Sequence, residues 1–539
     1  MSSALPSDLP STPPFAWPSA LPSTTLTPSV LIVGAGLSGL STAVFLGLHG
    51  VDTLVVERHR GLSTQPKARG QMPATMEALA VAGLTERFAA AEPPGRHAMK
   101  IVIAESMTGR VYRDFAETMP DFSRFSPCRD GMVSQQRAER ILADRAVELG
   151  VRILFDTEVE SFEQTPEQVV VRLRDTRDTR GTGGDHTAPA RYLIAADGHK
   201  GPIREAAGIG VHGRQRATDS ATMFASFHAD LAAALDGAAV GLWHLHNPAL
   251  PHGSAVVVTT DEPGRFVIGG AFDAGDATTD RLTGHIRTAA GDPDLTVEGV
   301  EIAWTRSGAW ITRVADTFRS GRVLLVGDCA HLMPPTGGQG GNAAVLDGYH
   351  LAWKLAAVLS GAADDRLLDS HDTERRPYAE MLAEQQYANF VRRSDPAGAD
   401  ETVAELIDPA RGLFGHVYPG GAFIAEPGHA DDGEFEDPAV PTARPGSRAP
   451  HAFLPDGSST RDLFGRGFVL LAAGREARWT AAAEAVRPQV TVHPLGDGAV
   501  RELYRLTEGT ATLVRPDGII AWRGTEPAAL ADALYRILH

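Results

Sequence analysis

The chain has 539 residues, enough for more than one domain, and its 43% hydrophobic and 22% charged residues are typical of a globular protein. The net charge of −17 argues against nucleic acid as the main partner, because its phosphates would be repelled. With only Cys128 and Cys329 and no long apolar run, the sequence offers no disulfide framework, no thiolate metal cluster and no membrane helix, so we expect a cytoplasmic protein.

The N-terminal residues 1–28 are rich in Pro and Ser and predict a disordered leader, since they lack the basic and apolar regions of a signal peptide. The segment "SVLIVGAGLSGLSTAVFLGLHGVDTLVVE" then predicts a buried strand over Val30–Val33, a helix over Leu37–Leu48 and a second strand that ends in Glu57. This order is the βαβ unit of a dinucleotide-binding domain, with an acidic residue about 20 positions beyond the glycines.

The G-x-G-x-x-G pattern of this unit is formed by Gly34, Gly36 and Gly39. The first glycine allows a tight turn, the second lets the backbone approach a pyrophosphate, and the third lets the helix pack on the strand. Glu57 would accept hydrogen bonds from the ribose hydroxyls of the nucleotide.

Farther along, residues 132–175 predict a helix, a strand and a β-hairpin, and residues 176–189 predict a polar, solvated loop. "ARYLIAADGHKGPIRE" predicts a strand that ends at Asp197–Gly198, followed by a helix that contains Arg204. Short strand-like runs between residues 213 and 312 predict an antiparallel sheet in a separate lobe. "GRVLLVGD" then returns to a buried strand of the first domain.

These patterns predict the domain organisation. Residues 29–212 and 313–400 form one discontinuous domain, and residues 213–312 form an inserted lobe. Residues 401–445, rich in Pro, Gly and Asp, predict a linker, and residues 446–539 predict a small α/β domain.

Three separated motifs stand out: "GAGLSG" with Glu57, "ADGHKGPIRE", and "GDCAHLMPPTGGQGGNAAVLDGYHLAWKLA". From Val30 to the C-terminus the chain resembles the FAD-dependent group A aromatic hydroxylases of the para-hydroxybenzoate hydroxylase fold, in the bacterial aromatic polyketide hydroxylase subgroup. The resemblance implies an α/β fold with a Rossmann-like FAD-binding domain, an inserted antiparallel-sheet substrate domain and a C-terminal thioredoxin-like domain. That last domain has no redox Cys pair, so we expect it to serve stabilisation or assembly.

The resemblance also implies a flavoprotein monooxygenase with non-covalent FAD and O2 as co-substrate. NADPH or NADH would be a transient reductant, and a flavin hydroperoxide would hydroxylate a phenolic, polyketide-type ring. Baeyer–Villiger oxygen insertion on a polyketide ketone and a flavin-binding protein without oxygenase activity remain alternatives. Both a monomer and a homodimer stay open, and the absence of a W-x-W-x-I-P segment disfavours a halogenase.

The second motif places Asp197 and Gly198 at the pyrophosphate region of the cofactor and closes with Arg204. In "VSQQRAE", Gln135 matches a family Gln near the cofactor phosphates, although Gln136 beside it leaves the choice open.

In "QPKARGQ", Lys67 stands where relatives have Arg, and Arg69 could supply the lost guanidinium, because Lys offers no bidentate contact. The predicted cofactor-binding residues are Gly34, Gly36, Leu37, Ser38, Gly39, Glu57, Arg58, Lys67, Arg69, Gln135, Asp197, Gly198, Arg204, Gly327, Asp328, Pro335, Gly337, Gly338, Gly340, Gly341 and Asn342.

The late motif, over residues 323–348, could be a second phosphate loop, but Asp328 would place a negative charge beside an anion. At the end of a buried strand this carboxylate suits ribityl hydroxyls instead. Pro334 and Pro335 withhold N–H groups, and the glycines let backbone amides approach a flavin ring. A helix predicted from about Asn342 would point its positive dipole end at the pyrimidine edge of that ring.

No catalytic base follows from the sequence, and His331 beside the flavin loop is a weak candidate. No metal site is expected. The inserted lobe offers six possible pocket-lining side chains, although each is more often core or surface: Phe224, Trp243, His244, His246, Phe266 and Phe272.

Overall fold

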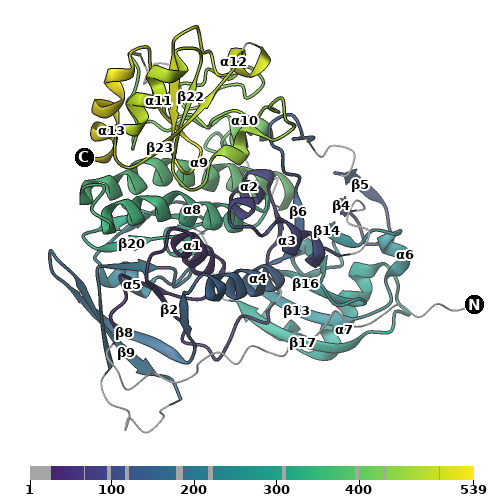
Figure 1. The fold of residues 1–539 in the computed structure, drawn as a ribbon. Helices are drawn as coiled ribbons and strands as arrows, with labels where there is room; N and C mark the ends of the chain where they lie inside the picture. The colour runs from purple at the N-terminus through teal and green to yellow at the C-terminus, as the bar shows by residue number, and fades with distance from the viewer. Residues whose placement is uncertain are drawn as a thin grey trace, which may run out of the picture.

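The computed structural model of the protein describes residues 26–65, 67–93, 99–115, 120–177, 186–215, 222–305, 311–394, 400–428, 433–496 and 498–539. Figure 1 shows the arrangement of its elements. The leader predicted over residues 1–28 falls outside these residues, apart from its last three. Among the described residues, no helix is both long and apolar enough to cross a membrane.

A six-stranded sheet in the order β19-β20-β11-β1-β2-β7 forms the centre of the first domain, and only its edge strand β19 is antiparallel. Its inner strands are short runs of Val, Leu and Ile that are almost fully buried, as in parallel sheets covered on both faces. The strands are β1 (Val30–Val33), β2 (Thr53–Val56), β7 (Arg152–Leu154), β11 (Tyr192–Ala195), β19 (Arg319–Ser320) and β20 (Val323–Leu325).

This strand order brings distant parts of the chain to one edge of the sheet. The parallel strands β1, β2, β11 and β20 end there and lead into the first glycine loop, Glu57, Asp197 and Gly327. Ligands of open α/β sheets bind outside the carboxyl ends of the strands. The fold therefore gathers four of the predicted cofactor segments at one place.

Helix α1 (Leu37–Leu48), with the predicted bounds, packs closely against α8 (Gln339–Leu359). A Cβ at Gly348 of α8 would lie 2.8 Å from the Cα of Thr42 in α1, so this contact requires glycine. In Figure 1 the green helices α8 and α9 (Asp369–Ser394) run between the purple α1 and the yellow C-terminal unit.

Helix α8 begins at Gln339 and not near Asn342 as predicted. Gly338, in the left-handed conformation with φ of 67°, turns the chain directly into the helix. The amide-rich first turn of α8 is therefore made by the glycine run itself.

The middle lobe is built on a seven-stranded sheet in the order β17-β13-β16-β15-β14-β4-β5. The prediction of an antiparallel sheet within residues 213–312 was wrong in two respects. Strands β4 and β5 come from residues 99–114, and β4 pairs with β14 in parallel. Pairing between strands so far apart in the chain leaves no local signal. The bounds are β4 (Met99–Ala104), β5 (Val111–Asp114), β13 (Thr222–His228), β14 (Val240–His246), β15 (Ser254–Thr259), β16 (Arg265–Ala271) and β17 (Glu298–Thr305), with α6 (Ala232–Leu235) and α7 (Thr279–Ala290).

The C-terminal unit contains a four-stranded sheet in the order β23-β22-β24-β25, in which β22 and β23 are parallel and the other pairs antiparallel. Phe468 of this sheet meets Trp353 of α8 edge to face, with ring centroids 5.7 Å apart. The bounds are β22 (Phe468–Ala472), β23 (Val490–Pro494), β24 (Ala511–Val514), β25 (Ile520–Gly524), α11 (Glu476–Glu484), α12 (Ala499–Leu503) and α13 (Leu530–Leu538).

The described part of the linker predicted over residues 401–445 is folded and packs against its neighbours. It contains α10 (Pro409–Phe414), and Val417 and Tyr418 are buried against neighbouring elements. Apolar residues between the prolines and glycines allow this segment to pack, although its overall composition predicts a linker.

In the part of the first domain that the structure describes, three smaller sheets and four helices accompany these elements. The polar stretch predicted as a loop over residues 176–189 continues into a strand at His186, because β10 pairs with β9. The bounds are β3 (Arg69–Gln71), β6 (Gly131–Ser134), β8 (Thr157–Gln164), β9 (Val169–Asp175), β10 (His186–Ala190), β12 (Val211–His212), β18 (Arg313–Ala315), β21 (His331–Leu332), α2 (Pro73–Val81), α3 (Thr85–Ala91), α4 (Gln135–Glu148) and α5 (Pro202–Ala206).

Candidate active site

The first glycine loop is shaped by close backbone contacts. The amide of Gly34 donates to the carbonyl of Val56 at 2.8 Å, and a Cβ at Gly34 would lie 2.4 Å from the carbonyl oxygen of Ala196. A Cβ at Gly39 would lie only 2.0 Å from the carbonyl oxygen of Gly34. No side chain caps α1 through Gly36, so the positive end of this helix faces the loop, as in anion sites at helix N-termini.

Glu57 lies against this loop at the end of β2. Its Oε2 accepts the amide of Ala35 at 2.9 Å, and its Oε1 accepts the amide of His59 at 2.9 Å. These bonds fix the carboxylate beside the loop, at the place predicted for ribose hydroxyls. The side chain of Arg58 next to it is exposed.

Asp197 follows β11, on the other side of the glycine loop. Its Oδ2 accepts the amide of Ile203 at 2.8 Å, whereas its buried Oδ1 has no hydrogen-bond partner among the described residues. Burial raises the pKa of this carboxyl, against the effect of the Ile203 amide. An acceptor left without a partner in a buried position indicates room for a donor from a ligand.

Arg204 is a buried brace of the turn after Asp197 and not a surface arginine. It is 3% exposed and its Nη1 donates to the carbonyl of Ile209 at 2.8 Å. A Cβ at Gly201 would lie 3.0 Å from its Nε. Its Nη1 supports the backbone of this turn and its Nη2 pairs with Glu205 at 3.1 Å, so its effect on a bound cofactor would be indirect.

The late loop lies directly on the first one. A Cβ at Gly327 would be 2.6 Å from the Cβ of Ser38, and Gly327 itself has φ of 69°. The amide of Gly327 donates to Oδ2 of Asp347, a buried residue of α8, at 3.0 Å. Asp328 beside it is exposed and faces outward from this fixed backbone.

Asp347 is the anchor of the late loop. Its Oδ2 lies 2.6 Å from Nε2 of His331, and its Oδ1 accepts Nε of Arg375 at 2.9 Å. Burial by itself would raise the pKa of Asp347, but the nearby His331 and Arg375 hold it well below its usual range. His331 is thus buried and engaged by Asp347, which does not support it as a base acting on substrate.

Asn342 connects α8 to the segment before α2. Its Oδ1 accepts the amide of Met72 at 2.8 Å, and its Nδ2 donates to the carbonyl of Gly338 at 2.7 Å. Between this helix start and α1 lies a pocket that brings together members of several predicted segments: Leu37, Arg69, Gln135, Gly338, Gly341 and Asn342.

The remaining glycine-run residues differ in their surroundings. Pro335 is exposed, and Gly340 and Gly341 are half-buried beside Met333 and Leu37. A Cβ at Gly337 would lie 2.1 Å from Oε1 of Gln386, so this glycine makes room for α9.

Gln135 lines the pocket, whereas the side chain of Gln136 turns away and donates to the carbonyl of Thr64. Nε2 of Gln135 donates to Oε1 of Glu139 at 2.7 Å. Glu139 was missed from the sequence, although it lies one helical turn after Gln135. It is 1% exposed near the start of α1, and burial raises its pKa.

The two basic residues of "QPKARGQ" take different positions. The side chain of Lys67 is exposed. Arg69 donates to the carbonyl of Met132 at 2.9 Å and forms an ion pair with Asp261, which also pairs with Arg137 at 3.2 Å. The guanidinium of Arg69 therefore ties the first domain to the middle lobe, and its availability to a cofactor is limited by Asp261.

The six predicted pocket residues separate onto two faces of the middle sheet. Trp243, Phe266 and Phe272 are at most 4% exposed and pack in a hydrophobic cluster with Leu282 and Ile286 of α7. The structure corrects their assignment: they form the core of the lobe, because side chains alternate along a strand and theirs point toward the helix.

The opposite face carries the other candidates. His244 pairs across the sheet with Val256 and Ile103, which are half-buried, and Phe224 is 41% exposed. Nε2 of His246 contacts the carbonyl oxygen of Arg393 in α9 at 2.9 Å. This face therefore looks toward the first domain.

His244 is the polar group that sets this face apart. It is 7% exposed, and neither of its ring nitrogens has a hydrogen-bond partner among the described residues. Burial, with a smaller contribution from Arg393, lowers its pKa to about 4, so the imidazole is neutral near pH 7. It can then donate one hydrogen bond and accept another.

Residues 27–386 match the family described as FAD binding domain, and residues 442–539 match the family described as aromatic-ring hydroxylase, C-terminal. The chain is 38% identical to the aklavinone 12-hydroxylase of Streptomyces purpurascens, over 94% of this chain and 98% of that protein. The chain belongs to the FAD-dependent aromatic hydroxylases.

Two further relatives are similar to this chain over almost its whole length. The chain is 36% identical to the 4-methyl-5-nitrocatechol 5-monooxygenase of a Burkholderia species, over 94% of this chain and 97% of that protein. The crystal structure of a ternary complex of aklavinone-11 hydroxylase with FAD and aklavinone matches it with a TM-score of 0.85 at 35% identity, covering 96% of this chain and 99% of that chain. The hydroxylase shares the mixed α/β fold of that enzyme.

The residues of the hydroxylase fit FAD. The first glycine loop packs so tightly on its own backbone and on Ala196 that a Cβ at Gly34 or Gly39 has no room, and the buried Oδ1 of Asp197 lacks a donor among the described residues. The late loop adds an exposed carboxylate at Asp328 and the uncapped first turn of α8. In the described part of the chain, no group of three or more His, Cys, Asp or Glu side chains is placed to hold a metal ion.

Proposed function

We propose that the hydroxylase is an NAD(P)H-dependent monooxygenase that places a hydroxyl group on a phenolic, polyketide-type ring. The contact of Gly327 with Ser38 carries the cofactor part of this proposal, since it makes the two glycine loops one continuous site. The substrate class is supported by the names of the three relatives reported above, two of which are aklavinone hydroxylases.

Each cofactor segment has a role in this proposal. Glu57 accepts the ribose hydroxyls, and the N-terminal end of α1 faces the pyrophosphate. Asp197 accepts a hydrogen bond through its free Oδ1, and Asp328 accepts the ribityl hydroxyls. The amides of Gly338–Asn342 face the flavin ring. When bound, FAD supplies hydride acceptance from NAD(P)H and activation of O2.

The substrate lies, in this proposal, on the face of the middle sheet that looks toward the first domain. Its apolar half-buried side chains, among them Ile103, Leu242 and Val256, suit a flat aromatic ring. The neutral imidazole of His244 would hydrogen-bond a phenol or quinone oxygen, which satisfies a nitrogen that is otherwise buried without a partner. The middle lobe is thus the substrate domain.

We also propose that the C-terminal unit is a thioredoxin-like domain. Its mixed sheet, with one parallel and two antiparallel pairings, supports this assignment. Both cysteines of the chain, Cys128 and Cys329, lie outside it, so it has no redox role.

The test uses the purified FAD-loaded hydroxylase with NADPH or NADH and O2. A tetracyclic hydroxyanthraquinone is expected to accelerate NADPH oxidation and to gain one oxygen atom as a ring hydroxyl, identified by mass and by NMR. A lactone or ester product would instead support Baeyer–Villiger insertion. If a panel of bicyclic to tetracyclic phenols never stimulates NADPH oxidation and only peroxide forms, the monooxygenase assignment is wrong.

The substrate face is tested with His244→Phe and its matched control Trp243→Phe. The two residues are neighbours on β14 but face opposite sides of the sheet. His244→Phe is expected to raise the KM for the aromatic substrate and leave NADPH oxidation without substrate unchanged. Equal KM values for parent and His244→Phe would remove His244 from the substrate site.

A further inference from the structure

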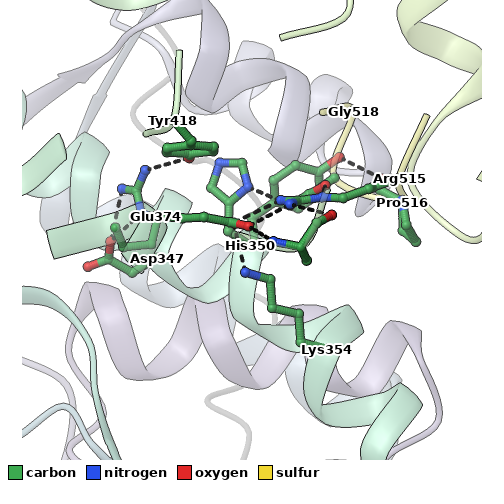
Figure 2. A network of polar contacts seen from close by, with 12 residues as sticks. Asp347, His350, Lys354, Glu374, Tyr418, Arg515, Pro516 and Gly518 are labelled. Atoms are coloured by element: carbon green, nitrogen blue, oxygen red, sulfur yellow. Dashed lines mark hydrogen bonds and ion pairs between the residues drawn. The ribbon is translucent and has the colours of Figure 1, made fainter. Parts of the chain in front are cut away.

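The turn between β24 and β25, residues 515–518, carries a buried ion pair that reaches out of the C-terminal unit. Nη1 and Nη2 of Arg515 donate to Oε1 and Oε2 of Glu374 in α9 at 2.6 and 2.9 Å. Asp517 holds the other edge of the same guanidinium, with Nε to Oδ1 at 2.9 Å and Nη2 to Oδ2 at 2.6 Å. All three side chains are completely buried. Figure 2 shows Arg515 aimed at Glu374.

The same turn also holds α8. Nδ1 of His350 lies 2.8 Å from Oδ2 of Asp517, and the hydroxyl of Tyr349 donates to the carbonyl of Pro516 at 3.3 Å. Nζ of Lys354 donates to Oε2 of Glu374 at 2.7 Å. Both helices are therefore fixed to one short turn, and to each other, through directional polar contacts (Figure 2).

The network continues from α9 to the late loop through the next residue in the chain. Glu374 faces the C-terminal turn, and its neighbour Arg375 donates through Nε to Oδ1 of Asp347 at 2.9 Å. Asp347 in turn accepts the amide of Gly327 at 3.0 Å. Buried polar contacts, joined at one step by the chain between Glu374 and Arg375, thus link Arg515 to the residue directly before Asp328.

The charges in this network are balanced, with Glu374 and Asp517 facing Lys354 and Arg515. Burial alone would raise the pKa of Glu374, but Arg515 and Lys354 lower it to about 2. A buried ion pair often adds little stability over apolar packing, because both groups lose their hydration. What it adds is direction, since bidentate Arg–carboxylate geometry fixes one orientation.

We propose that the C-terminal unit positions the flavin loop, residues 327–342, through Arg515, the pair Glu374–Arg375 and Asp347, and thereby slows the release of FAD. Arg515 and Glu374 are positioning residues, because they act through α9 and not on the cofactor. The proposal gives the unit a task in cofactor retention that needs no cysteine. It rests on the placement of FAD at Asp328 and the glycine run.

The experiment measures the rate of FAD release from the holoenzyme, followed by the rise of free-flavin fluorescence after dilution. Arg515→Met removes the bidentate ion pair with Glu374. The double variant Arg515→Met with Glu374→Gln breaks the same contact but removes one positive and one negative charge, so the net charge of the network stays balanced between Lys354 and Asp517. We expect both variants to release FAD about tenfold faster or more, an effect of the size of one charged hydrogen bond at the flavin loop.

Arg523→Met is the matched control. Arg523 lies on β25 of the same unit, and among the described residues its guanidinium hydrogen-bonds Glu426 and the carbonyl of Thr442, neither of which belongs to α8 or α9. We expect this variant to release FAD at the parental rate. The melting temperature of each apoprotein is measured alongside, because a purely structural role would lower it without changing the stabilisation that added FAD provides.

The outcomes separate cleanly. If the double variant is folded by circular dichroism and releases FAD at the parental rate, the proposal is overturned. Equal acceleration by Arg523→Met overturns it as well, and so does failure of both Arg515 variants to fold, because the turn would then serve the whole fold. Asp328→Ala, measured in parallel, tests the placement of FAD: if it retains flavin like the parent, the loop assignment fails and not the network alone.

Discussion

The two loops that form the proposed cofactor site are held in place by different means. The first glycine loop is set by backbone contacts within the βαβ unit and to the neighbouring Ala196, where two of its glycines leave no room for a Cβ. The late loop is set by side chains from elsewhere: Asp347 of α8 receives the amide of Gly327, and Arg375 of α9 holds Asp347. A short motif therefore carries the shape of the first loop, whereas that of the second depends on buried charges.

We therefore expect substitutions in the first glycine loop to act sterically and substitutions around the late loop to act through charge. Effects on FAD retention should decrease in the following order: the steric change at Gly39, the buried anchor Asp347, the exposed acceptor Asp328 and the distant carboxyl of Glu139.

Gly39→Ala should have the largest effect on FAD retention. Its Cβ would lie 2.0 Å from the carbonyl oxygen of Gly34, so the loop backbone must move. We expect loss of FAD binding in equilibrium dialysis, with a stability cost of about 1–3 kcal/mol from overpacking. Gly61→Ala is the control, because a Cβ there meets nothing within 4 Å. Retention of FAD by Gly39→Ala would show that the loop tolerates a side chain.

Asp347→Asn should come next. It leaves Arg375 buried at 2% exposure without its carboxylate, and loss of one partner of a buried ion pair costs about 3–5 kcal/mol. We expect a lower free energy of unfolding in urea for the apoprotein as well as faster FAD release. If only FAD release changes, the anchor serves the ligand and not the loop.

Asp328→Ala separates the anchor from the acceptor. Because Asp328 is exposed, its loss should leave the apoprotein as stable as the parent. FAD release should become about tenfold to a hundredfold faster, as expected for hydrogen bonds to a charged acceptor worth about 1.5–3 kcal/mol. Stopped-flow flavin fluorescence measures the rate, and an unchanged rate removes Asp328 from the cofactor site.

Glu139→Gln should have the smallest effect, and it should depend on pH. Burial raises the pKa of Glu139 above its unfolded value. Its contribution to stability is therefore full below the unfolded pKa and is lost as pH rises through the folded pKa. Gln cannot lose a proton, so the variant should gain stability relative to the parent as pH rises, with slightly slower FAD release. Parallel melting curves of parent and variant at every pH would contradict this.

The parts of the fold that local sequence determines were predictable. The helix over Leu37–Leu48 is confirmed at both ends, because an apolar run follows a glycine loop and stops at a glycine-bounded turn. The gathering of Glu57, Asp197 and Gly327 also followed from the rule for parallel strands. Neither statement needed a contact between distant side chains.

The roles of side chains that sequence reasoning could not assign depend on such contacts. Trp243 and His244 are adjacent in the chain, and only the packing of α7 decides that the tryptophan belongs to the core and the histidine to the other face. Glu139 is buried only because α4 packs beside α1, which the sequence of α4 alone does not reveal. Arg515 and Glu374 meet across 141 positions of the chain, a separation that no local pattern reveals.

The parallel pairing of β4 with β14 means that the middle lobe is not a removable cassette. Two of its seven strands are contributed by residues 99–114, before the chain has built the rest of the first domain. In a chimera that exchanges only residues 213–312 with a relative, the β14 of the relative would have to pair with the β4 of this chain. A poor match would leave an unpaired strand edge that promotes aggregation. Anyone grafting a new specificity onto this scaffold has to transplant both stretches together.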